Sequence, residues 1–399
     1  MKKVLVPKVR FKGFSEEWSE ERFGELLFRI NEKGYEFLET LTASKSGEML
    51  KRKSINYHIQ VAKESLKNYN RVLKNDFVLH LSTYESGLAY SKEIGITSPA
   101  YDVLRFFDKN NNDPIFFKYV FSNKKFINSL VPFTYGLREG KSINLEELNK
   151  SLIEKTNISE QQKIGKLLDH IYNLITHEEI KLNKLKQVKE TLLQKMFPEG
   201  NSKTPKIRFK GFEGEWKEER FGDTIEPYRI KNYNNEKFQS YSISNKFGFV
   251  NQKEFFENGG KAIRANKSNS LVVFPNSFAY NPARIDVGSI GLYKKEENCL
   301  VSPIYEVFKT DRKMNDEFLF NWFKIDKFKW IVNKSKEGSV RNTVYLKNIS
   351  DYLINFPSYS EQQKIGDFFS KISNLISLYQ SKLNKLKQIK DALLQKMFI

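Results

Sequence analysis

Apolar residues recur at alternating intervals of four and three positions in two separate stretches of this chain. A seam of this kind, sustained over five heptads, predicts a long helix that packs in a coiled coil. We therefore expect long helices within residues 156–198 and 358–399, each a rod of roughly 57 Å at about 1.5 Å per residue. One lysine, Lys189 or Lys390, interrupts each seam at the same place. The seams comprise Ile164, Leu168, Ile171, Ile175, Leu182, Leu185, Leu192 and Met196, and then Ile365, Phe369, Ile372, Ile376, Tyr379, Leu383, Leu386, Leu393 and Met397.

The ends of both predicted helices carry their own signals. Ser159 with Gln162, and Ser360 with Gln363, have the spacing of a capping box, in which side chains satisfy free N–H groups at a helix start. Pro198 follows the first stretch, at a point where a helix does not readily continue. The two helices are therefore expected to start at these serines.

The chain is an internal duplication with a period near 200 residues. Residues 7–14 return almost unchanged as 205–212, and residues 159–197 return as 360–398 with 25 identities in 39 positions. This period is too long for a solenoid, so each half is read as one globular domain followed by one helix. We place the domains at residues 1–155 and 199–357, and the long helices that act as spacers at 156–198 and 358–399.

Between the repeated blocks the two halves differ strongly, as expected if a shared scaffold carries two separately tuned surfaces. Residues 98–103 and 302–307 keep a faint similarity, which predicts that the two domains share a fold. Short apolar runs at 77–81 and 270–274 are typical of buried strands, and turn-forming residues separate such runs. We expect an α/β (α+β) fold: two mixed-sheet domains joined by two long helices in an antiparallel coiled coil, with pseudo-two-fold symmetry.

The charge of the chain indicates a polyanionic partner. Sixty-seven Lys and Arg against 48 Asp and Glu give a formal net charge of +19. The two helical blocks contribute only +2 and +4, so most of the excess lies in the globular domains. Neutralising phosphates and releasing counterions gives such a protein affinity for nucleic acid. A generally lysine-rich composition is the alternative explanation.

The remaining composition bears on the cellular compartment. Cys299 is the only cysteine, which excludes internal disulfides and favours a reducing cytoplasm. No run of about 18 apolar residues is present, so we expect no membrane span. No long apolar segment follows the charged first residues, so we expect no secretory signal.

Polar and basic turns in both domains are the candidate DNA contacts. Reading a base edge requires side chains such as Arg, Asn or Gln in fixed geometry, and loops on a rigid scaffold usually present them. An ordinary solvated turn is the alternative for each residue, and more than half of protein–DNA hydrogen bonds go to phosphate and sugar. The candidates are Lys45, Ser46, Arg52, Lys53, Ser82, Tyr84, Glu85, Arg138 and Lys141 in the first domain, and Arg229, Lys231, Asn232, Asn245, Lys246, Tyr280, Asn281, Arg284, Arg341 and Asn342 in the second.

Enzymatic motifs are largely missing from the sequence. There is no GxxxxGK[ST] phosphate loop and no GxGxxG after a strand. Residues 281–284, Asn-Pro-Ala-Arg, are similar to the Asn-Pro-Pro-aromatic box of amino-methyltransferases but lack its second proline and its aromatic residue. We therefore expect no catalytic residue and no cofactor in this chain, and Glu85 suits an acceptor for a cytosine amino group at least as well as it suits catalysis. No metal site is expected either, because no zinc-like spacing connects His58, His80, His170 and His177.

In several motifs the sequence resembles the specificity (S) subunits of type I restriction-modification systems. The repeated Pro-Lys-[Val/Ile]-Arg-Phe-Lys-Gly-Phe with its following tryptophan, and Glu-Gln-Gln-Lys-Ile-Gly at each helix start, carry the resemblance. Leu-Asn-Lys-Leu-Lys-Gln and Leu-Leu-Gln-Lys-Met-Phe in each helix, and residues 280–284 with 288–291, complete it. The first domain departs from the pattern, because it has no Asn-Pro-x-Arg segment.

The resemblance implies a DNA-recognition subunit without chemistry of its own. Two target-recognition domains would each read one half of a split DNA sequence, and the paired helices would set the gap between them. Two modification subunits would supply S-adenosylmethionine for adenine methylation, and restriction subunits would use ATP and Mg²⁺. Outward-facing helix residues would dock these partners; the candidates are Lys184, Gln187, Lys385 and Gln388.

Two other functions remain open from the residues alone. One is a non-sequence-specific architectural nucleic-acid-binding protein, which would bind scrambled duplexes equally well with a steep salt dependence. The other is a DNA adenine methyltransferase in its own right, which would bind S-adenosylmethionine without a partner. The divergence between the two domains argues against the first, because indifferent binding gives no reason for two distinct surfaces.

Overall fold

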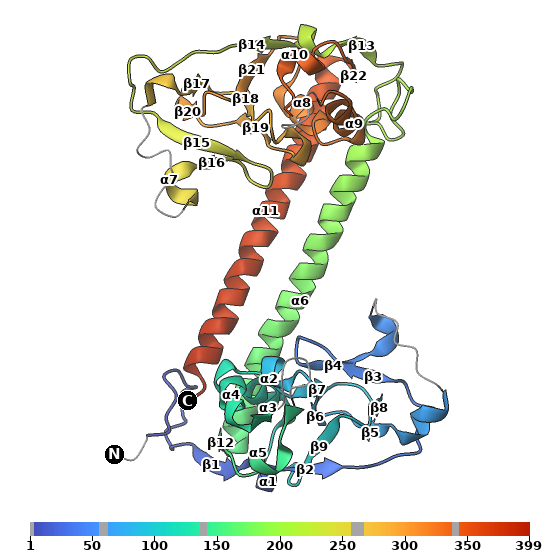
Figure 1. Cartoon of the computed structure of the whole chain (residues 1–399), viewed down its shortest axis with the longest axis vertical. Helices are drawn as coiled ribbons and strands as arrows, with labels where there is room; N and C mark the ends of the chain where they lie inside the picture. Colours follow the sequence, from blue (N-terminus) through green and yellow to red (C-terminus); the bar gives the residue numbers. More distant parts are fainter. Residues whose placement is uncertain (1–3, 56–62, 136–141, 257–266, 337–342) are drawn as a thin grey trace. The chain divides into compact units, whose positions relative to one another are not determined.

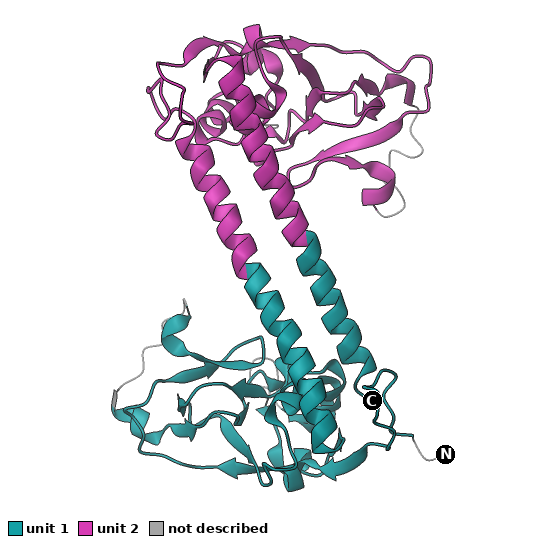
Figure 2. Cartoon of the chain, turned by 180° about the vertical axis from the view of Figure 1, so that it is seen from behind, with its two compact units in different colours: residues 1–179, 381–399 teal, residues 180–380 magenta. Residues whose placement is uncertain are grey.

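The computed structural model describes residues 4–55, 63–135, 142–256, 267–336 and 343–399 (Figure 1). The chain forms two compact units, one of residues 1–179 with 381–399 and one of residues 180–380 (Figure 2). Each unit therefore holds one globular domain, the start of one long helix and the end of the other. In the described part of the chain, no helix has the length and apolar character needed to cross a membrane.

The two long helices are α6, Ile158–Lys195, and α11, Tyr359–Lys396, with 38 residues each. Every residue of the two predicted seams is buried or half-buried, which confirms the seams as the inward faces of the helices. The predicted start at Ser159 is wrong, because the side chain of Asn157 caps α6 by accepting the Glu160 N–H at 3.0 Å. At α11 the corresponding cap position is Ser358, whose carbonyl accepts the Glu361 N–H.

Within each unit, the two helical segments lie side by side and run in opposite directions. In unit 1, Ile164 near the start of α6 and Met397 just after the end of α11 share one core, while Lys382 Nζ lies 2.8 Å from Glu178 Oε1 further along α6. In unit 2, Lys189 of α6 donates to Ser373 Oγ of α11 at 2.8 Å. The segments therefore contact each other through both apolar and polar groups.

The globular domain of unit 1 contains a mixed sheet of six strands in the order β2-β9-β6-β7-β4-β3, in which β4 and β7 are parallel. Three two-stranded sheets, β1-β12, β5-β8 and β10-β11, flank it. The strands are β1 Ser19–Arg22, β2 Leu27–Ile30, β3 Leu41–Ala43, β4 Glu48–Lys51, β5 Asn70–Val72, β6 Phe77–Leu79, β7 Ala89–Ser91, β8 Gly95–Thr97, β9 Asp102–Phe106, β10 Thr134–Tyr135, β11 Ser142–Ile143 and β12 Leu152–Lys155. The helices are α1 Phe23–Leu26, α2 Thr83–Ser86, α3 Pro114–Phe121, α4 Lys124–Ser129 and α5 Leu145–Leu148, with 3-10 turns η1 Arg52–Ser54, η2 Lys63–Asn68 and η3 Val131–Phe133.

The globular domain of unit 2 contains two four-stranded sheets, β14-β21-β18-β19 and β16-β15-β20-β17, and the pair β13-β22. Strands β15 and β20 are parallel, so this domain is mixed as well. The strands are β13 Lys217–Arg220, β14 Ile225–Pro227, β15 Gln239–Ser244, β16 Gly248–Asn251, β17 Leu271–Val273, β18 Ser277–Tyr280, β19 Ile290–Tyr293, β20 Cys299–Val301, β21 Glu306–Thr310 and β22 Leu353–Phe356. The helices are α7 Gln252–Phe255, α8 Asp316–Trp322, α9 Asp326–Lys334 and α10 Leu346–Ile349, with 3-10 turns η5 Phe221–Thr224, η8 Lys267–Asn269 and η9 Ile285–Val287.

The two domains share strand pairings down to the register. Strand β3 pairs with β4 through Leu41↔Lys51 and Ala43↔Met49, and β15 pairs with β16 through the equivalent Tyr241↔Asn251 and Ile243↔Phe249. Strands β6 and β9 pair in the same way as β18 and β21. The faint sequence similarity of 98–103 and 302–307 therefore reflects a common domain fold.

The repeated sequence blocks are the joints between each domain and its helix. In unit 1, the Arg10 guanidinium binds both carboxylate oxygens of Glu160, at 2.6 and 2.8 Å, and Glu160 is fully buried. In unit 2, Arg208 binds Glu361 with distances of 2.7 and 2.8 Å. Planar guanidinium and carboxylate groups match in such paired hydrogen bonds, which makes them strong and directional. This contact explains why the arginine motif and the Glu-Gln-Gln motif repeat together.

Other positions of the same motifs complete each joint. Gln161 Oε1 accepts the Asp113 N–H at 2.8 Å and so holds the start of α3 against α6. Gly165 allows this approach, since a Cβ there would lie 2.9 Å from the Phe116 backbone nitrogen. Aromatic rings close the other side: Trp18 packs against Phe398 at the end of α11, with ring centroids 6.2 Å apart. Unit 2 repeats these contacts with Gln362, Gly366, Trp216 and Phe197.

Candidate nucleic-acid interface

A tight turn between β3 and β4 forms the first candidate contact of unit 1. The Gly47 N–H donates to the Ser44 carbonyl at 3.1 Å, and Gly47 has a φ of 76°, in the region that favours glycine. Lys45 and Ser46 form the exposed tip of the turn. A cation and a hydroxyl are thus presented to solvent on a rigid connection.

Helix α2 lies beside this turn and carries three further predicted residues. A Cβ built on Gly47 would lie 3.4 Å from the Ser86 carbonyl oxygen, so the two backbones are neighbours. Ser82 and Glu85 are exposed, whereas Tyr84 is half-buried and packs against the core of unit 1. Residues 45–46 and 82–85, far apart in sequence, therefore form one surface, which we call the first recognition surface.

The buried residue His80 holds the backbone of this surface in place through hydrogen bonds. The buried imidazole accepts the Ser82 N–H at Nδ1, at 3.3 Å, and the Thr83 hydroxyl accepts the His80 N–H at 2.7 Å. Burial lowers the pKa of His80 to about 4, so the ring is neutral at pH 7. This residue supports the loop and adds no positive charge to it.

Arg52 and Lys53 lie in η1, at the other end of β4. Lys53 Nζ donates to Glu39 Oε1 at 2.6 Å, which partly neutralises its charge. The Arg52 guanidinium lies 5.9 Å from the centre of the Tyr69 ring and is half-buried. Both residues are therefore engaged with the domain itself as well as with solvent.

The β15–β16 turn of unit 2 occupies the position that the β3–β4 turn has in unit 1. The Ser244 hydroxyl accepts the Lys246 and Phe247 N–H groups at 3.2 and 3.3 Å. Asn245 and Lys246 are exposed at the tip. We call this turn the second recognition surface; it presents a different pair of side chains at an equivalent place.

The predicted segment 280–284 contains both buried and exposed residues. Tyr280 is fully buried, and its hydroxyl donates to the Val344 carbonyl at 3.0 Å. The Asn281 side chain accepts the Ala283 N–H at 3.1 Å and so shapes the turn. Arg284 is exposed. Of the predicted contacts in this segment, Arg284 is therefore the exposed one.

The segment around residue 230 is similar. The Asn232 side chain is buried, donating to the Glu236 carbonyl and accepting the Glu236 N–H, so it closes its own loop. Arg229 is exposed, but its guanidinium donates to the Tyr305 carbonyl at 3.2 Å. Lys231 is half-buried. Four further candidates lie outside the described residues: Arg138, Lys141, Arg341 and Asn342.

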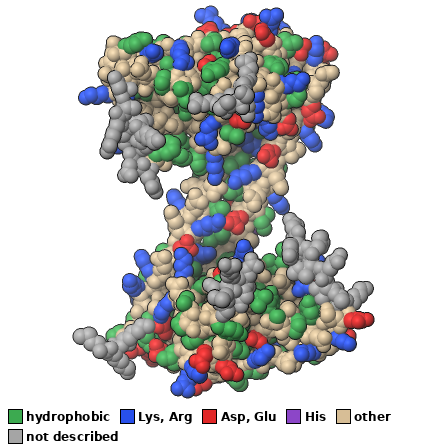
Figure 3. Space-filling view, viewed as in Figure 1, with side chains coloured by type: hydrophobic (Ala, Val, Ile, Leu, Met, Phe, Trp, Pro, Cys, Tyr) green, Lys and Arg blue, Asp and Glu red, His purple; other side chains and the backbone are tan. Residues whose placement is uncertain are grey.

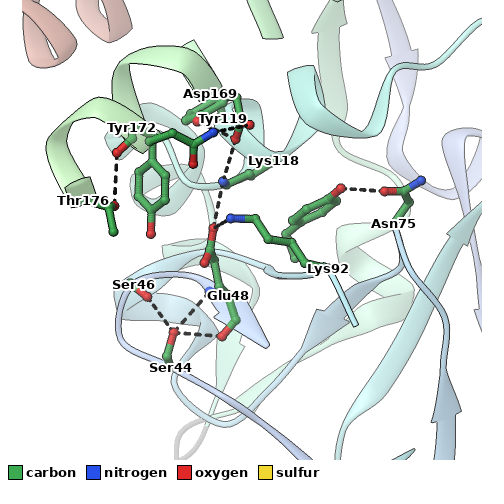
Figure 4. Close-up of polar contacts among 12 residues, drawn as sticks. Ser44, Ser46, Glu48, Asn75, Lys92, Lys118, Tyr119, Asp169, Tyr172 and Thr176 are labelled. Carbon is green, nitrogen blue, oxygen red and sulfur yellow. Dashed lines mark hydrogen bonds and ion pairs between the residues drawn. The ribbon is translucent and has the colours of Figure 1, made fainter. Parts of the chain in front are cut away.

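A buried charge network lies directly behind the first recognition surface (Figure 4). Glu48, which follows the turn, receives two lysines: Lys118 Nζ and Lys92 Nζ each lie 2.8 Å from its Oε1. Lys118, on α3, also lies 3.3 Å from Asp169 Oδ1 of α6 and 4.4 Å from the centre of the Tyr172 ring. The recognition turn is thus tied to the long helix through ionic contacts.

The two lysines favour the charged form of Glu48. Burial alone raises the pKa of Glu48, but the two ammonium groups outweigh it and hold this pKa below its ordinary value. The sequence gives no signal for these residues, because Glu48, Lys92, Lys118 and Asp169 share no spacing or motif. Only the tertiary fold brings them together.

Positive charge is spread over both units. In the view of Figure 3, Lys and Arg side chains are interspersed with Asp and Glu on each of them. On the helices, the four residues proposed for partner docking, Lys184, Gln187, Lys385 and Gln388, are all exposed. Across the described ranges, no group of three or more His, Cys, Asp or Glu side chains is arranged to hold a metal ion.

Comparison with known proteins identifies the family of the second half. Residues 210–388 match the family model described as "Type I restriction modification DNA specificity domain". No curated protein sequence gives a significant match.

Among solved structures, the chain is similar to the type I restriction-modification S subunit from M. genitalium, with a TM-score of 0.62 and 14% identity over 99% of both chains. This likeness shows that the fold is shared. Weaker matches are a chain from a study of complex assembly and conformational transition of the type I R-M system (TM-score 0.49, 14% identity, 96% of this chain and 97% of that chain) and the HsdS subunit from Thermoanaerobacter tengcongensis (TM-score 0.43, 13% identity, 96% of both chains).

Proposed function

We propose that this chain, whose residues 210–388 match the type I restriction-modification DNA specificity domain, recognises a DNA target in two separate parts and directs methyltransferase subunits to it. One observation carries the proposal. The β3–β4 and β15–β16 turns have the same register in two equivalent domains, yet one presents Lys45 and Ser46 and the other Asn245 and Lys246. A common scaffold with different exposed side chains suits two different half-sites.

The proposed contact set follows from exposure. In unit 1 it comprises the first recognition surface, with Arg52 and Lys53 as secondary contacts. In unit 2 it comprises the second recognition surface with Arg284, Arg229 and Lys231. Asn232, Tyr280 and Asn281 leave the set, because their polar groups form hydrogen bonds within the protein. Glu85 remains the candidate acceptor for a cytosine amino group.

We propose further that α6 and α11 form an antiparallel coiled coil that separates the two domains and relates them by a pseudo-two-fold axis. The buried seams and the opposite directions of the segments within each unit support this. Helices of 38 residues are roughly 57 Å long, whereas B-DNA repeats about every 34 Å. Such a spacer would place two readers on separate major-groove segments.

The chemistry would belong to partner subunits. Two methyltransferase subunits would carry S-adenosylmethionine, and restriction subunits, where present, would use ATP and Mg²⁺. The exposed helix residues Lys184, Gln187, Lys385 and Gln388 would contribute to docking. The chain itself would act without a catalytic residue, in the cytoplasm.

The test is a map of N6-methyladenine in cells that express the cognate modification subunit with and without this chain. We expect a split motif that is methylated only when the chain is present. Replacing Asn245 and Lys246 by alanine should relax or abolish one half of the motif and leave the other half unchanged, and replacing Lys45 and Ser46 should do the converse. If the two purified subunits form a complex but methylation does not change, the chain is a non-sequence-specific nucleic-acid-binding protein.

A further inference from the structure

Unit 2 contains a basic pocket that the proposed role of the recognition turns does not explain. It has a volume of about 770 Å³ and opens beneath the second recognition surface, between β19, α8, α9 and the two long helices. Pockets of roughly 300–1,000 Å³ are typical for small ligands. Its charged lining consists of Lys189, Lys246, Lys294, Lys295, Lys324, Lys329 and Asp286. The single acid is already paired, since Lys336 Nζ lies 3.2 Å from Asp286 Oδ2.

The shared register shows which part of unit 1 corresponds to this pocket. Because β15–β16 repeats the pairing of β3–β4, Gly248 stands where unit 1 has Glu48. Because β18–β19 repeats the pairing of β6–β7, Lys294 stands where unit 1 has Lys92. The pocket therefore occupies the place of the Glu48 network: Lys294 is kept and pairs with Glu317 of α8, and glycine replaces Glu48.

Two of the remaining substitutions place smaller side chains around the same space. The caps of α3 and α8 align Lys118 with Phe320. The repeated helix sequence aligns Asp169 with Ser370 and Tyr172 with Ser373. Unit 2 thus has glycine and serine where unit 1 has two carboxylates and an aromatic ring. The smaller side chains leave room for a ligand. No carboxylate stands at positions 248 and 370, which correspond to Glu48 and Asp169.

Two lysines enter the emptied space, and both have neutral partners. Lys189 Nζ donates to Ser373 Oγ at 2.8 Å, and Lys324 Nζ donates to Asn321 Oδ1 at 3.4 Å while lying 3.5 Å from the centre of the Phe320 ring. Burial, followed by the charge of Lys189, lowers the pKa of Lys324 to about 7. Burying ammonium groups without an anion is costly, so an anionic ligand would relieve this cost.

We propose that this pocket binds a phosphate-type anion, held by Lys189 and Lys324 in the place that the Glu48 carboxylate fills in unit 1. Ser373, whose hydroxyl donates to the Phe369 carbonyl and accepts from Lys189, would position that lysine. A phosphate offers several acceptor oxygens to converging ammonium donors, which a single carboxylate does not match. The anion comes either from a free phosphate-bearing molecule or from the DNA backbone, and the experiment separates these two sources.

The experiment is calorimetric titration of the full-length chain with inorganic pyrophosphate and, separately, with a short DNA duplex. Ser373→Asp would install a carboxylate beside Lys189, and Lys324→Met would remove one ammonium group. Exposed Lys347, outside the pocket, provides the control variant Lys347→Met with the same change in net charge. We expect one pyrophosphate per chain, with affinity weakened at least about tenfold in both pocket variants and unchanged in the control.

Two other outcomes are informative. If pyrophosphate does not bind but both pocket variants weaken duplex binding more than the control does, the anion is a DNA phosphate. If pyrophosphate does not bind and the pocket variants bind duplex as the control does, the proposal is overturned. Methylation maps made with the wild-type chain test the proposed function separately, so its failure would leave the pyrophosphate result standing.

Discussion

The joint between Arg10 and Glu160 allows a quantitative test of why the two repeated motifs occur together. In the variant Arg10→Ala, Glu160 loses both of its guanidinium hydrogen bonds, at 2.6 and 2.8 Å, and keeps the Thr156 hydroxyl as its donor. The carboxylate is fully buried, and removing one partner of a buried ion pair typically costs 3–5 kcal/mol. We expect a loss of about 3 kcal/mol in the free energy of unfolding of unit 1.

The equivalent variant in unit 2 sharpens this expectation. Position 357, which corresponds to Thr156, is proline, so Arg208→Ala leaves Glu361 without that hydroxyl. We therefore expect Arg208→Ala to cost at least as much as Arg10→Ala. Because the chain has two units, urea denaturation followed by circular dichroism should show which transition moves.

The control for this prediction is the double variant Arg10→Ala with Glu160→Gln. Its uncharged amide has a smaller desolvation cost than an unpaired carboxylate, so stability should partly recover relative to Arg10→Ala alone. A loss below about 1 kcal/mol for Arg10→Ala, with no recovery in the double variant, would show that the joint contributes no more than an exposed ion pair.

Three further predictions concern other joints and the two charge sites. Gly165→Ala should lower stability by about 1–3 kcal/mol in thermal unfolding, because its Cβ would lie 2.9 Å from the Phe116 backbone nitrogen; an exposed first-turn change, Ser159→Ala, should leave stability within about 0.5 kcal/mol. Lys118→Met should destabilise unit 1 at pH 7, and the difference in stability from wild type should shrink on acidification. The pKa of Glu48 is lowered in the folded protein, so the contribution of its ion pairs to stability is present above the ordinary value of 4.5. That contribution is lost as the pH falls through the lowered pKa. A constant difference from pH 7 to pH 3 would contradict this. Relative to Lys324→Met, the wild type should gain affinity for pyrophosphate from pH 8 to pH 6, since the pKa of Lys324 is lowered to about 7; comparison with the variant cancels the ionisation of pyrophosphate itself. The charged groups that influence Lys324 are Lys189, Lys294 and Glu317.

The long helices were predictable because their signal is local and repeated. A heptad seam is visible in the sequence of one segment, and its residues are buried or half-buried along α6 and α11, with Met196 and Met397 just after the helix ends. The helix start was missed by two residues because Asn157 and Ser159 are both good capping residues, and the fold uses the first of them.

The candidate contacts were only partly predictable for a different reason. Asn232 and Tyr280 have the polar groups that DNA recognition requires, but both serve the fold instead: Asn232 closes its own loop, and the Tyr280 hydroxyl, at the end of β18, donates to the Val344 carbonyl. The ionic network at Glu48 could not be predicted, because its members come from β4, α3 and α6 and meet only after folding. The same holds for the basic pocket of unit 2, which is recognised only by comparison with its counterpart.

The repeated joints have a consequence for how such a protein can change over time. Each domain is attached through the same small set of contacts: arginine to glutamate, glutamine to a helix start, a glycine that permits close approach, and tryptophan to a terminal phenylalanine. None of these contacts involves the tips of the recognition turns. A genetic exchange that replaces the whole segment between the arginine motif and the glutamate motif would therefore bring in a new surface, and the attachment is kept where the incoming segment carries its own tryptophan and helix start. Inheritance of a new specificity then requires one crossover on each side and no adjustment of the helices.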